Sequence, residues 1–305
     1  MTAGIKRSKS DVIFDRINVL IMIVIMFVMI YPMYFVLIAS ISDPTAVSTG
    51  QVILYPVGYT LDAYRNVFVN SRIWVGYANT ILYTVLGTLY NLVLTISCAY
   101  VLSKKDLPFH NLLSWYFFIT MYFGGGMIPT YLLIKDLHLI DTRWVMIIGA
   151  GVSCYNMIVT RSFFTNSIPD SLYEAAYIDG ASEIRTFIKI ALPLSTPIIA
   201  VMALYYGVGH WNSYTNALYY LRDKDLWPLQ MILRQILILN QETLQILINS
   251  GDATQDQLEA AVQAAHLAEA MKYALVFVAA APLLCVYPFV QKYFVKGVMI
   301  GSVKG

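Results

Sequence analysis

The chain has 305 residues, of which 58% are hydrophobic and only 12% are charged, and its formal net charge at pH 7 is +2. About a quarter of the residues of a soluble domain are charged, so this composition excludes an ordinary soluble protein and indicates a chain that crosses a membrane several times. The small net charge, with no basic run longer than a pair, gives no support for nucleic-acid binding.

The N-terminal part predicts a tail, a span and a loop. Residues 1–16 are basic and form a predicted cytoplasmic tail. The uncharged stretch 17–41 is long enough, at about 1.5 Å per residue, to cross a hydrocarbon core of roughly 30 Å. It exceeds the apolar region of about 7–15 residues in a signal peptide, so we expect an uncleaved first span. Residues 42–72 are rich in turn formers, and 61–68 among them predict a short amphipathic helix.

Three further spans are predicted before the main polar loop. The second covers the uncharged residues 73–103 and ends at Lys104-Lys105. The third, 111–134, contains three consecutive glycines at 124–126, so we expect it to be broken or loosened within the membrane. The fourth covers 144–164, with Arg161 near its inner end, where its long side chain can reach the lipid headgroups.

The fifth and sixth spans enclose a large outer segment. The fifth covers 190–221, and residues 209–216 concentrate hydrogen-bonding and aromatic side chains at membrane depth. An outer helical segment, 222–271, leads into the last span, 273–290. The distribution of Lys and Arg then places both termini and the loop after the fourth span in the cytoplasm, by the positive-inside rule.

Motifs for metal or nucleotide chemistry are absent from the sequence. The three cysteines lie far apart in apolar runs, with no Cys-x-x-Cys and no His-Glu-x-x-His. A Gly-x-x-x-x-Gly-Lys-[Ser/Thr] phosphate loop is absent as well. We therefore expect no cofactor in this chain, and ATP with Mg²⁺ would have to bind to a partner.

The loop between the fourth and fifth spans, residues 170–193, contains Glu-Ala-Ala at 174–176 and then Gly180, Ile190, Leu192 and Pro193. The alanines favour a compact helix, Gly180 permits a bend, and Pro193 suits the start of a helix. This pattern resembles the signature loop of the permease subunits of bacterial ATP-driven (ABC) importers. An ordinary amphipathic loop helix with a chance Glu-Ala-Ala is the alternative.

The resemblance implies that the loop forms a coupling helix that docks into a groove of a cytoplasmic ATPase. The residues that would make this contact are Glu174, Ala175, Ala176, Asp179, Gly180, Ala181, Ile190, Leu192 and Pro193.

Three more stretches, 208–214, 226–234 and 287–305, resemble the LplC-type branch of carbohydrate-importer permeases. The resemblance implies an all-α integral membrane protein with the type I importer fold, in which residues 17–296 form one domain of six transmembrane helices in the bacterial cell membrane. It also implies a second, homologous permease as heterodimer partner, two ATPases, an extracellular lipid-anchored binding protein and an oligosaccharide cargo. The cytoplasmic tail 297–305 would reach between the ATPases.

Four residues are candidates for lining the sugar pathway: Trp211, Asn212, Tyr214 and Asn216. In a continuous helix the two asparagines share one face and the two aromatics lie on an adjacent one. Rings suit the apolar faces of a sugar and amides suit its hydroxyls. An interfacial aromatic belt is the alternative for the rings.

Other functions fit the sequence less well. An anionic solute such as phosphate would favour Arg or Lys along the pathway, and the spans contain almost none; an amino acid or peptide remains an alternative cargo. A membrane-embedded enzyme would need a catalytic partner for His210, and no acidic residue lies in its span. We therefore expect a transport subunit and no enzyme.

Overall fold

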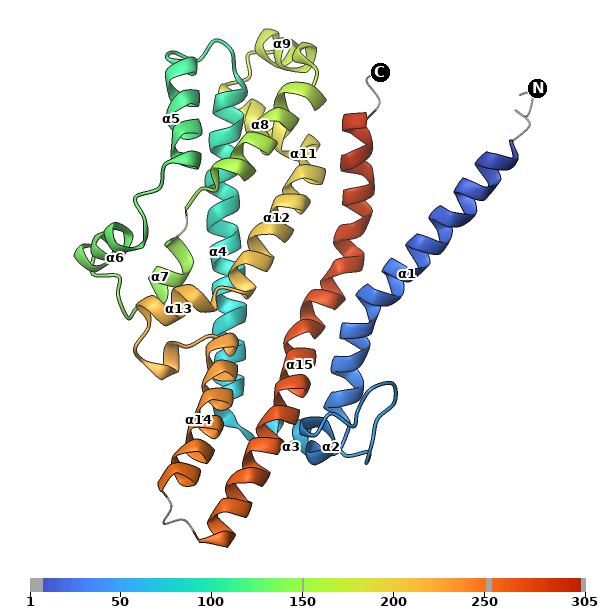
Figure 1. Cartoon of the computed structure of the whole chain (residues 1–305). Coiled ribbons are helices and arrows are strands. Elements are labelled where there is room, and N and C mark those ends of the chain that lie inside the picture. The colour runs from blue at the N-terminus through green and yellow to red at the C-terminus, as the bar shows by residue number, and fades with distance from the viewer. Residues whose placement is uncertain (1–7, 150, 251–253, 303–305) are drawn as a thin grey trace. The chain divides into compact units, whose positions relative to one another are not determined.

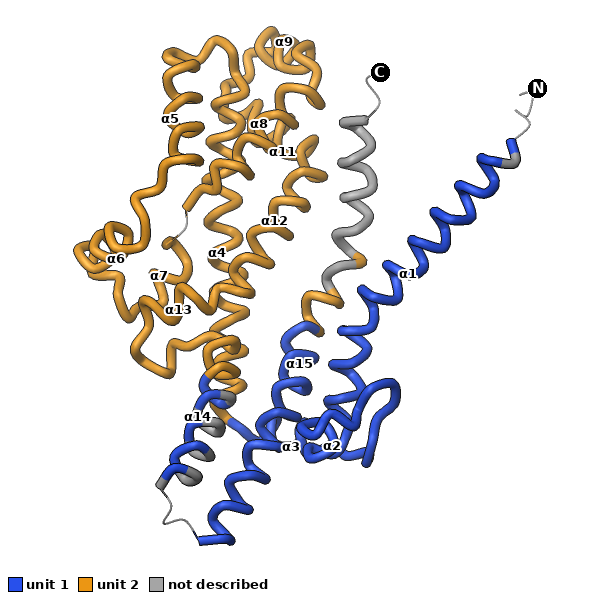
Figure 2. The backbone as a smooth tube through the Cα atoms, in the orientation of Figure 1, with its two compact units in different colours: residues 1–70, 235–280 blue, residues 71–234, 281–305 orange. Residues whose placement is uncertain are grey.

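The computed structural model describes residues 8–149, 151–250 and 254–302, and every regular element in these ranges is a helix (Figure 1). The chain divides into two compact units (Figure 2). The first unit comprises residues 1–70 and 235–280, and the second comprises 71–234 and 281–305. Each unit is described by itself.

The first unit contains α1 (Lys9–Ser40), α2 (Pro44–Ser48), α3 (Asp62–Val69) and parts of α14 (Leu229–Ser250) and α15 (Gln255–Ser302). Most side chains of α1 before Phe35 are exposed and apolar, as expected of a helix that faces lipid. Its end packs on α2, and the ring of Phe35 meets Tyr273 of α15 edge to face, with centroids 5.5 Å apart. These contacts form a small apolar core around Ala39 and Val47.

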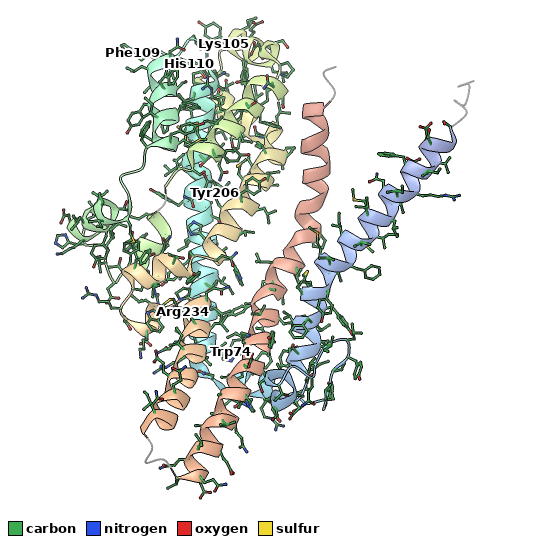
Figure 3. All side chains as sticks on the ribbon, in the orientation of Figure 1. Trp74, Lys105, Phe109, His110, Tyr206 and Arg234 are labelled. Carbon is green, nitrogen blue, oxygen red and sulfur yellow. The ribbon has the colours of Figure 1, made fainter. Side chains whose placement is uncertain are left out.

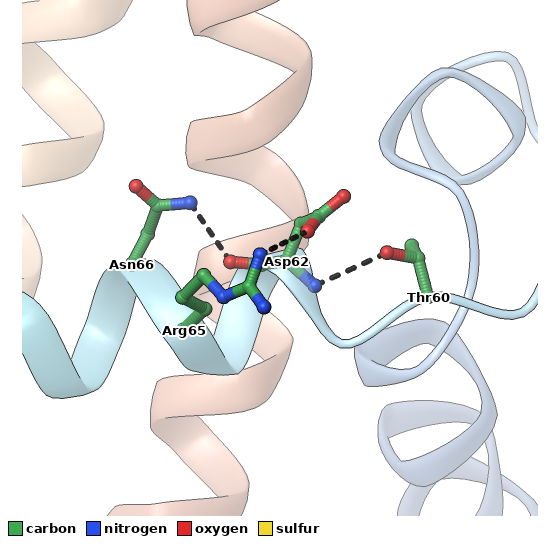
Figure 4. Close-up of polar contacts among 4 residues, drawn as sticks. All are labelled: Thr60, Asp62, Arg65 and Asn66. Carbon is green, nitrogen blue, oxygen red and sulfur yellow. Dashed lines mark hydrogen bonds and ion pairs between the residues drawn. The ribbon is translucent and has the colours of Figure 1, made fainter.

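Helix α3 is the predicted amphipathic helix of residues 61–68, which is thereby confirmed. Ala63 and Val67, four residues apart, are buried on one face. Polar contacts close its first turn (Figure 4): the Asp62 N–H donates to Thr60 Oγ1 at 3.2 Å, and Asn66 Nδ2 donates to the Asp62 carbonyl at 2.8 Å. The ion pair of Arg65 with Asp62, at 4.0 Å, is exposed and adds little.

The second unit is organised around α4 (Ser71–Ser103), which packs against α7, α8 and α12. Its other helices are α5 (His110–Tyr122), α6 (Met127–Asp136), α7 (Arg143–Ile148), α8 (Cys154–Ser167), α9 (Asp170–Ile178), α10 (Glu183–Thr186), the π-helix η1 (Phe187–Ala191), α11 (Leu192–Leu194), α12 (Thr196–Trp211), α13 (Tyr214–Tyr220) and the 3₁₀ helix η2 (Lys224–Leu226).

The apolar helices match most of the predicted spans. Among the described residues, α1, α4 and the first 31 residues of α15 are each long and apolar enough to cross a membrane. Two bent pairs bring the number to as many as five: α5 with α6, bent by 113°, and residues 183–194 with α12, bent by 79°. The expected break of the third span is confirmed, because residues 123–126 separate α5 from α6 and Gly126 has a φ of +83°.

The predicted fourth span, 144–164, is not one continuous helix. Helix α7 ends at Ile148 and α8 begins at Cys154, so non-helical backbone separates them. Gly149 and Gly151 favour helix poorly, and Ser153 begins α8 as a cap, since its hydroxyl accepts from the Asn156 N–H.

The C-terminal part of α15 continues to Ser302, through most of the predicted tail 297–305. Side chains after Pro288 and all of residues 303–305 lie outside the described part of the chain. The contact of this tail with ATPases therefore stays a prediction.

Candidate coupling segment and pathway site

Helix α9 carries the Glu-Ala-Ala motif, and Gly180 ends it. Gly180 has a φ of +72°. Its N–H donates to the Tyr177 carbonyl at 3.0 Å, and the Ala181 N–H donates to the Ala176 carbonyl at 2.9 Å. These two bonds define a Schellman motif, which requires a left-handed residue that only glycine adopts at little cost. Gly180 therefore determines where α9 ends and where the chain turns.

The segment after the turn returns to the membrane helices. Ser182 caps α10 by accepting from the Arg185 N–H. Helices α10, η1 and α11 follow one another without a non-helical residue, so Pro193 lies inside this helical stretch and not at its start. Ile190 and Leu192 are half-buried, whereas Pro193 is exposed. The predicted coupling residues therefore form two groups: those of α9 and its turn are mostly exposed, and those of the segment 190–193 are partly buried.

The outer face of α9 is an exposed surface with apolar and acidic groups. Tyr177 of α9 is 81% exposed and Ile178 83%, and Ile184 of the following helix α10 is 72% exposed. Glu174, Ala175 and Asp179 are exposed as well, and only Ala176 of the motif is buried. Large exposed apolar side chains beside charged ones are typical of a surface that contacts another protein.

A hollow lies beside the contact between α9 and the end of α4. This cavity of about 660 Å³ is lined by side chains of both helices and of the intervening turn, among them Lys104, Lys105, Tyr173, Glu174 and Glu183. Lys105 is labelled in Figure 3, as are Phe109 and His110 at the start of α5.

Lys104 is one of the groups that form this contact. Its Nζ lies 3.4 Å from the ring centroid of Tyr173 and 4.9 Å from that of Tyr100. Such a cation–π contact is worth about 0.5–2 kcal/mol, with the larger values where water is excluded. Burial lowers the pKa of Lys104, against the opposing effect of the acidic groups Glu183, Asp106 and Asp170. Burial also raises the pKa of Tyr173 to about 12.

Within the spans, Asn91 of α4 joins His210 of α12 to the break between α7 and α8. Asn91 Nδ2 donates to the Gly151 carbonyl at 2.5 Å, and Asn91 Oδ1 lies 2.6 Å from His210 Nε2. A carbonyl only accepts, so the amide nitrogen faces Gly151 and its oxygen faces the imidazole. His210 must therefore carry its proton on Nε2 and donate it to Asn91.

One turn further along α4 and α12, a second pair of side chains also joins the two helices to the break between α7 and α8. Thr95 Oγ1 and Tyr206 Oη are 2.6 Å apart, and the Ser153 N–H donates to Tyr206 Oη at 3.2 Å (Tyr206 is labelled in Figure 3). Non-helical backbone at membrane depth is tolerated only where its polar groups are satisfied. The two links supply those partners for Gly151 and Ser153, so this polar cluster stabilises the broken span.

The predicted pathway residues do not form one helical face. Helix α12 ends at Trp211 and α13 begins at Tyr214, so the same-face argument for Asn212 and Asn216 was wrong. The reason is local: Asn212 Nδ2 donates back to the Val208 carbonyl and Ser213 Oγ to the His210 carbonyl, which ends the helix. Asn212, Tyr214 and Asn216 are nevertheless exposed.

Trp211 differs from these three residues because it is buried. Its ring meets Tyr77 of α4 edge to face, with centroids 5.9 Å apart. It also borders an almost entirely apolar cavity of about 460 Å³ between α4, α12 and residues 282–283. Trp211 therefore lines this apolar cavity and packs α12 against α4.

The motif stretch 226–234 is held by the opposite end of α4. Asn79 Nδ2 donates to the carbonyls of Asp225 and Trp227, and Tyr83 Oη donates to that of Leu226. Thr80 Oγ1 accepts from the Leu229 N–H at 2.9 Å. The two ends of α4 thus bind the segments before and after the pathway helix α12.

The residues that sequence reasoning missed are mainly polar side chains inside spans. Asn91 and Thr95 lie in the uncharged stretch 73–103, which the sequence predicts only as a span. Their spacing of four residues in an apolar helix was an available signal, because polar side chains in spans usually bond to a neighbouring helix. Among the described residues, no group of His, Cys, Asp and Glu is placed to hold a metal ion.

These features define a class: an integral-membrane transport component with an exposed helix for a protein partner. Residues 73–300 match the family described as "Binding-protein-dependent transport system inner membrane component", and the chain belongs to this family.

Full-length relatives agree with this assignment. The chain is 39% identical to Protein LplC of Bacillus subtilis (strain 168), over 98% of this chain and 97% of that protein. It is 38% identical to the polygalacturonan/rhamnogalacturonan transport system permease protein YtcP of the same organism, over 96% and 99%. A crystal structure of a bacterial ABC transporter involved in the import of the acidic polysaccharide alginate contains a similar chain, with 32% identity and a TM-score of 0.83 over 95% of this chain and 100% of that one.

The chain is therefore a type I ABC importer permease subunit located in a membrane. It is a transport subunit and not an enzyme, and its family works with an ATPase and a binding protein.

Proposed function

We propose that this permease forms half of the pathway by which an oligosaccharide enters the cell. The observation that carries the cargo class is the relation to YtcP over nearly the whole of both chains, because YtcP is named for polygalacturonan/rhamnogalacturonan transport. The similar chain from an alginate importer supports the same class. Both named cargoes are polysaccharides. We therefore assign a saccharide as the class of cargo, and no particular sugar.

The proposed assembly follows the plan expected from the sequence. A second, homologous permease completes the pathway, two ATPases bind ATP and Mg²⁺, and an extracellular lipid-anchored protein delivers the sugar. Both termini and α9 lie in the cytoplasm in this arrangement. Support comes from the basic residues around α9, namely Lys104, Lys105, Arg185 and Lys189, since cytoplasmic loops are enriched in Lys and Arg.

The coupling role falls to the exposed α9 turn. Glu174 and Asp179 can pair with basic groups of the ATPase, while Tyr177 and Ile178 offer an apolar contact.

The cargo assignment is tested by uptake into vesicles that contain the complete complex with its binding protein. We expect ATP-dependent uptake of an oligosaccharide from a panel of neutral and acidic oligosaccharides, amino acids and peptides. The binding protein should show the same preference by calorimetry. Uptake of an amino acid or peptide, with none of any saccharide, would contradict the proposal.

The exposed polar residues after α12 are expected to line the pathway. Tyr214→Ala and Asn216→Leu should each reduce uptake about tenfold, the cost of about 1.4 kcal/mol of lost sugar contact, with the complex still assembled. Trp211→Ala should reduce uptake and also lower the thermal stability of the permease, because Trp211 is buried against Tyr77. Thr215→Val, at an exposed neighbouring position, is the matched control. Wild-type uptake in both pathway variants would favour an interfacial aromatic belt.

A further inference from the structure

Lys104 lies directly after α4, with its ammonium between aromatic rings of two helices. The ring of Tyr173, at 3.4 Å from Nζ, belongs to α9 and precedes Glu174 in the sequence. The ring of Tyr100, at 4.9 Å, belongs to the last turn of α4. A cation is attracted to the faces of aromatic rings at these distances. Lys104 therefore links the helix that carries the coupling motif to the end of the central helix.

Tyr100, in the last turn of α4, also contacts α10 and η1. Its hydroxyl donates to Glu183 Oε2 of α10 at 3.3 Å, and its ring centroid lies 4.8 Å from that of Phe187 in η1. Tyr100 itself is buried, with 5% of its surface exposed. The end of α4 thus touches α9, α10 and η1 through one compact group of side chains.

The hollow beside this group makes its contacts important. A cavity of about 660 Å³ lies between α9 and the turn after α4, and beside it the side chains of Lys104, Tyr173 and Tyr100 bring α9 into contact with α4. A rigid, locally packed group transmits motion, whereas an open cavity does not.

Helix α4 connects this group of side chains to the pathway helix α12. Helix α4 is continuous from Ser71 to Ser103. It carries Asn91 and Thr95, which bond to His210 and Tyr206 of α12, and it forms one wall of the apolar cavity beside Trp211. A shift of its end is thereby passed to the helix that precedes the pathway residues.

We propose that Lys104 is a positioning residue for coupling, which holds α9 against the end of α4 so that movement of the docked ATPase reaches the pathway. This role rests on the proposed docking of the ATPase at α9. It predicts that loss of the Lys104 contact separates ATP hydrolysis from transport without detaching the ATPase.

The test uses the complete complex in vesicles and measures bound ATPase, ATP hydrolysis and uptake in each preparation. Lys104→Met and Tyr173→Leu are expected to keep the ATPase bound and to lower uptake per ATP hydrolysed by about fivefold, the scale of one cation–π contact. Lys104→Arg should restore the ratio, because the guanidinium also stacks on a ring. A variant that is merely less stable lowers uptake and hydrolysis together and leaves the ratio unchanged.

Two matched controls isolate the contact. Tyr173→Phe keeps the ring and removes only a buried hydroxyl that has no hydrogen-bond partner within the described part of the chain, so the ratio should be that of the wild type. Lys105→Met removes the neighbouring, exposed cation that lines the same cavity, and should also leave the ratio unchanged.

A wild-type ratio in Lys104→Met would overturn the proposal. An equal loss in Lys105→Met would as well, since it would indicate a general charge effect. Detachment of the ATPase by Lys104→Met would place the residue in the docking surface instead. If Lys104→Met does not reach the membrane, the comparison of Tyr173→Leu with Tyr173→Phe decides alone. Failure of α9 as the docking site is recognised separately, by normal ATPase binding in a variant at Gly180.

Discussion

Gly180→Leu is expected to release the ATPase and to reduce ATP-driven uptake at least about tenfold, while the permease still inserts in the membrane. The left-handed conformation costs a leucine roughly 1–2 kcal/mol, and Gly180 has a φ of +72°. A Cβ at this position would meet no atom within 4 Å. The effect therefore comes from the backbone: the Schellman bonds are lost and the exposed face of α9 turns away from the ATPase.

A graded series separates this explanation from simple bulk. Gly180→Asn should retain most uptake, because asparagine tolerates the left-handed region, and Gly180→Ala should be intermediate despite its smaller side chain. Bound ATPase is quantified after purification, and hydrolysis is measured with and without cargo-loaded binding protein. Normal stimulated hydrolysis in Gly180→Leu would sink the coupling role of the α9 turn.

The sequence predicted the α9 turn well because its determinants are local. A motif of small helix-forming residues and one glycine specifies a helix and a left-handed turn within a short segment. The break after α5 was predictable for the same reason, since three consecutive glycines interrupt any helix. Long apolar helices such as α1 and α4 followed from length and hydropathy alone.

Features that depend on contacts between distant segments could not be predicted in this way. The break between α7 and α8 exists because Asn91 and Tyr206, on other helices, satisfy Gly151 and Ser153. Trp211 was expected to face the pathway, yet its packing on Tyr77 depends on how α12 meets α4. The sequence predicts Lys104 only as the charged end of a span, because its partner Tyr173 is 69 residues away in the sequence.

The close contact of Gly87 with His210 is expected to be the most sensitive point inside the spans. A Cβ on Gly87 would lie 2.5 Å from His210 Nε2 and 2.7 Å from Nδ1, so it would clash with the imidazole ring. Gly87→Ala should therefore lower the free energy of unfolding by about 1–3 kcal/mol, the usual cost of overpacking. Uptake should fall with it, because displacement of the ring breaks the bond to Asn91 that supports the α7–α8 break.

A double-variant cycle tests this contact directly. His210→Ala alone should also destabilise, because it removes the partner of Asn91 Oδ1 inside the spans. The three atoms nearest to that Cβ all belong to the His210 ring, so the double variant should be no less stable than His210→Ala. Gly209→Ala is the matched control, because a Cβ there meets nothing within 4 Å and alanine favours helix. Thermal unfolding of the purified variants measures all four; additive losses in the double variant would show that Gly87 acts on something other than His210.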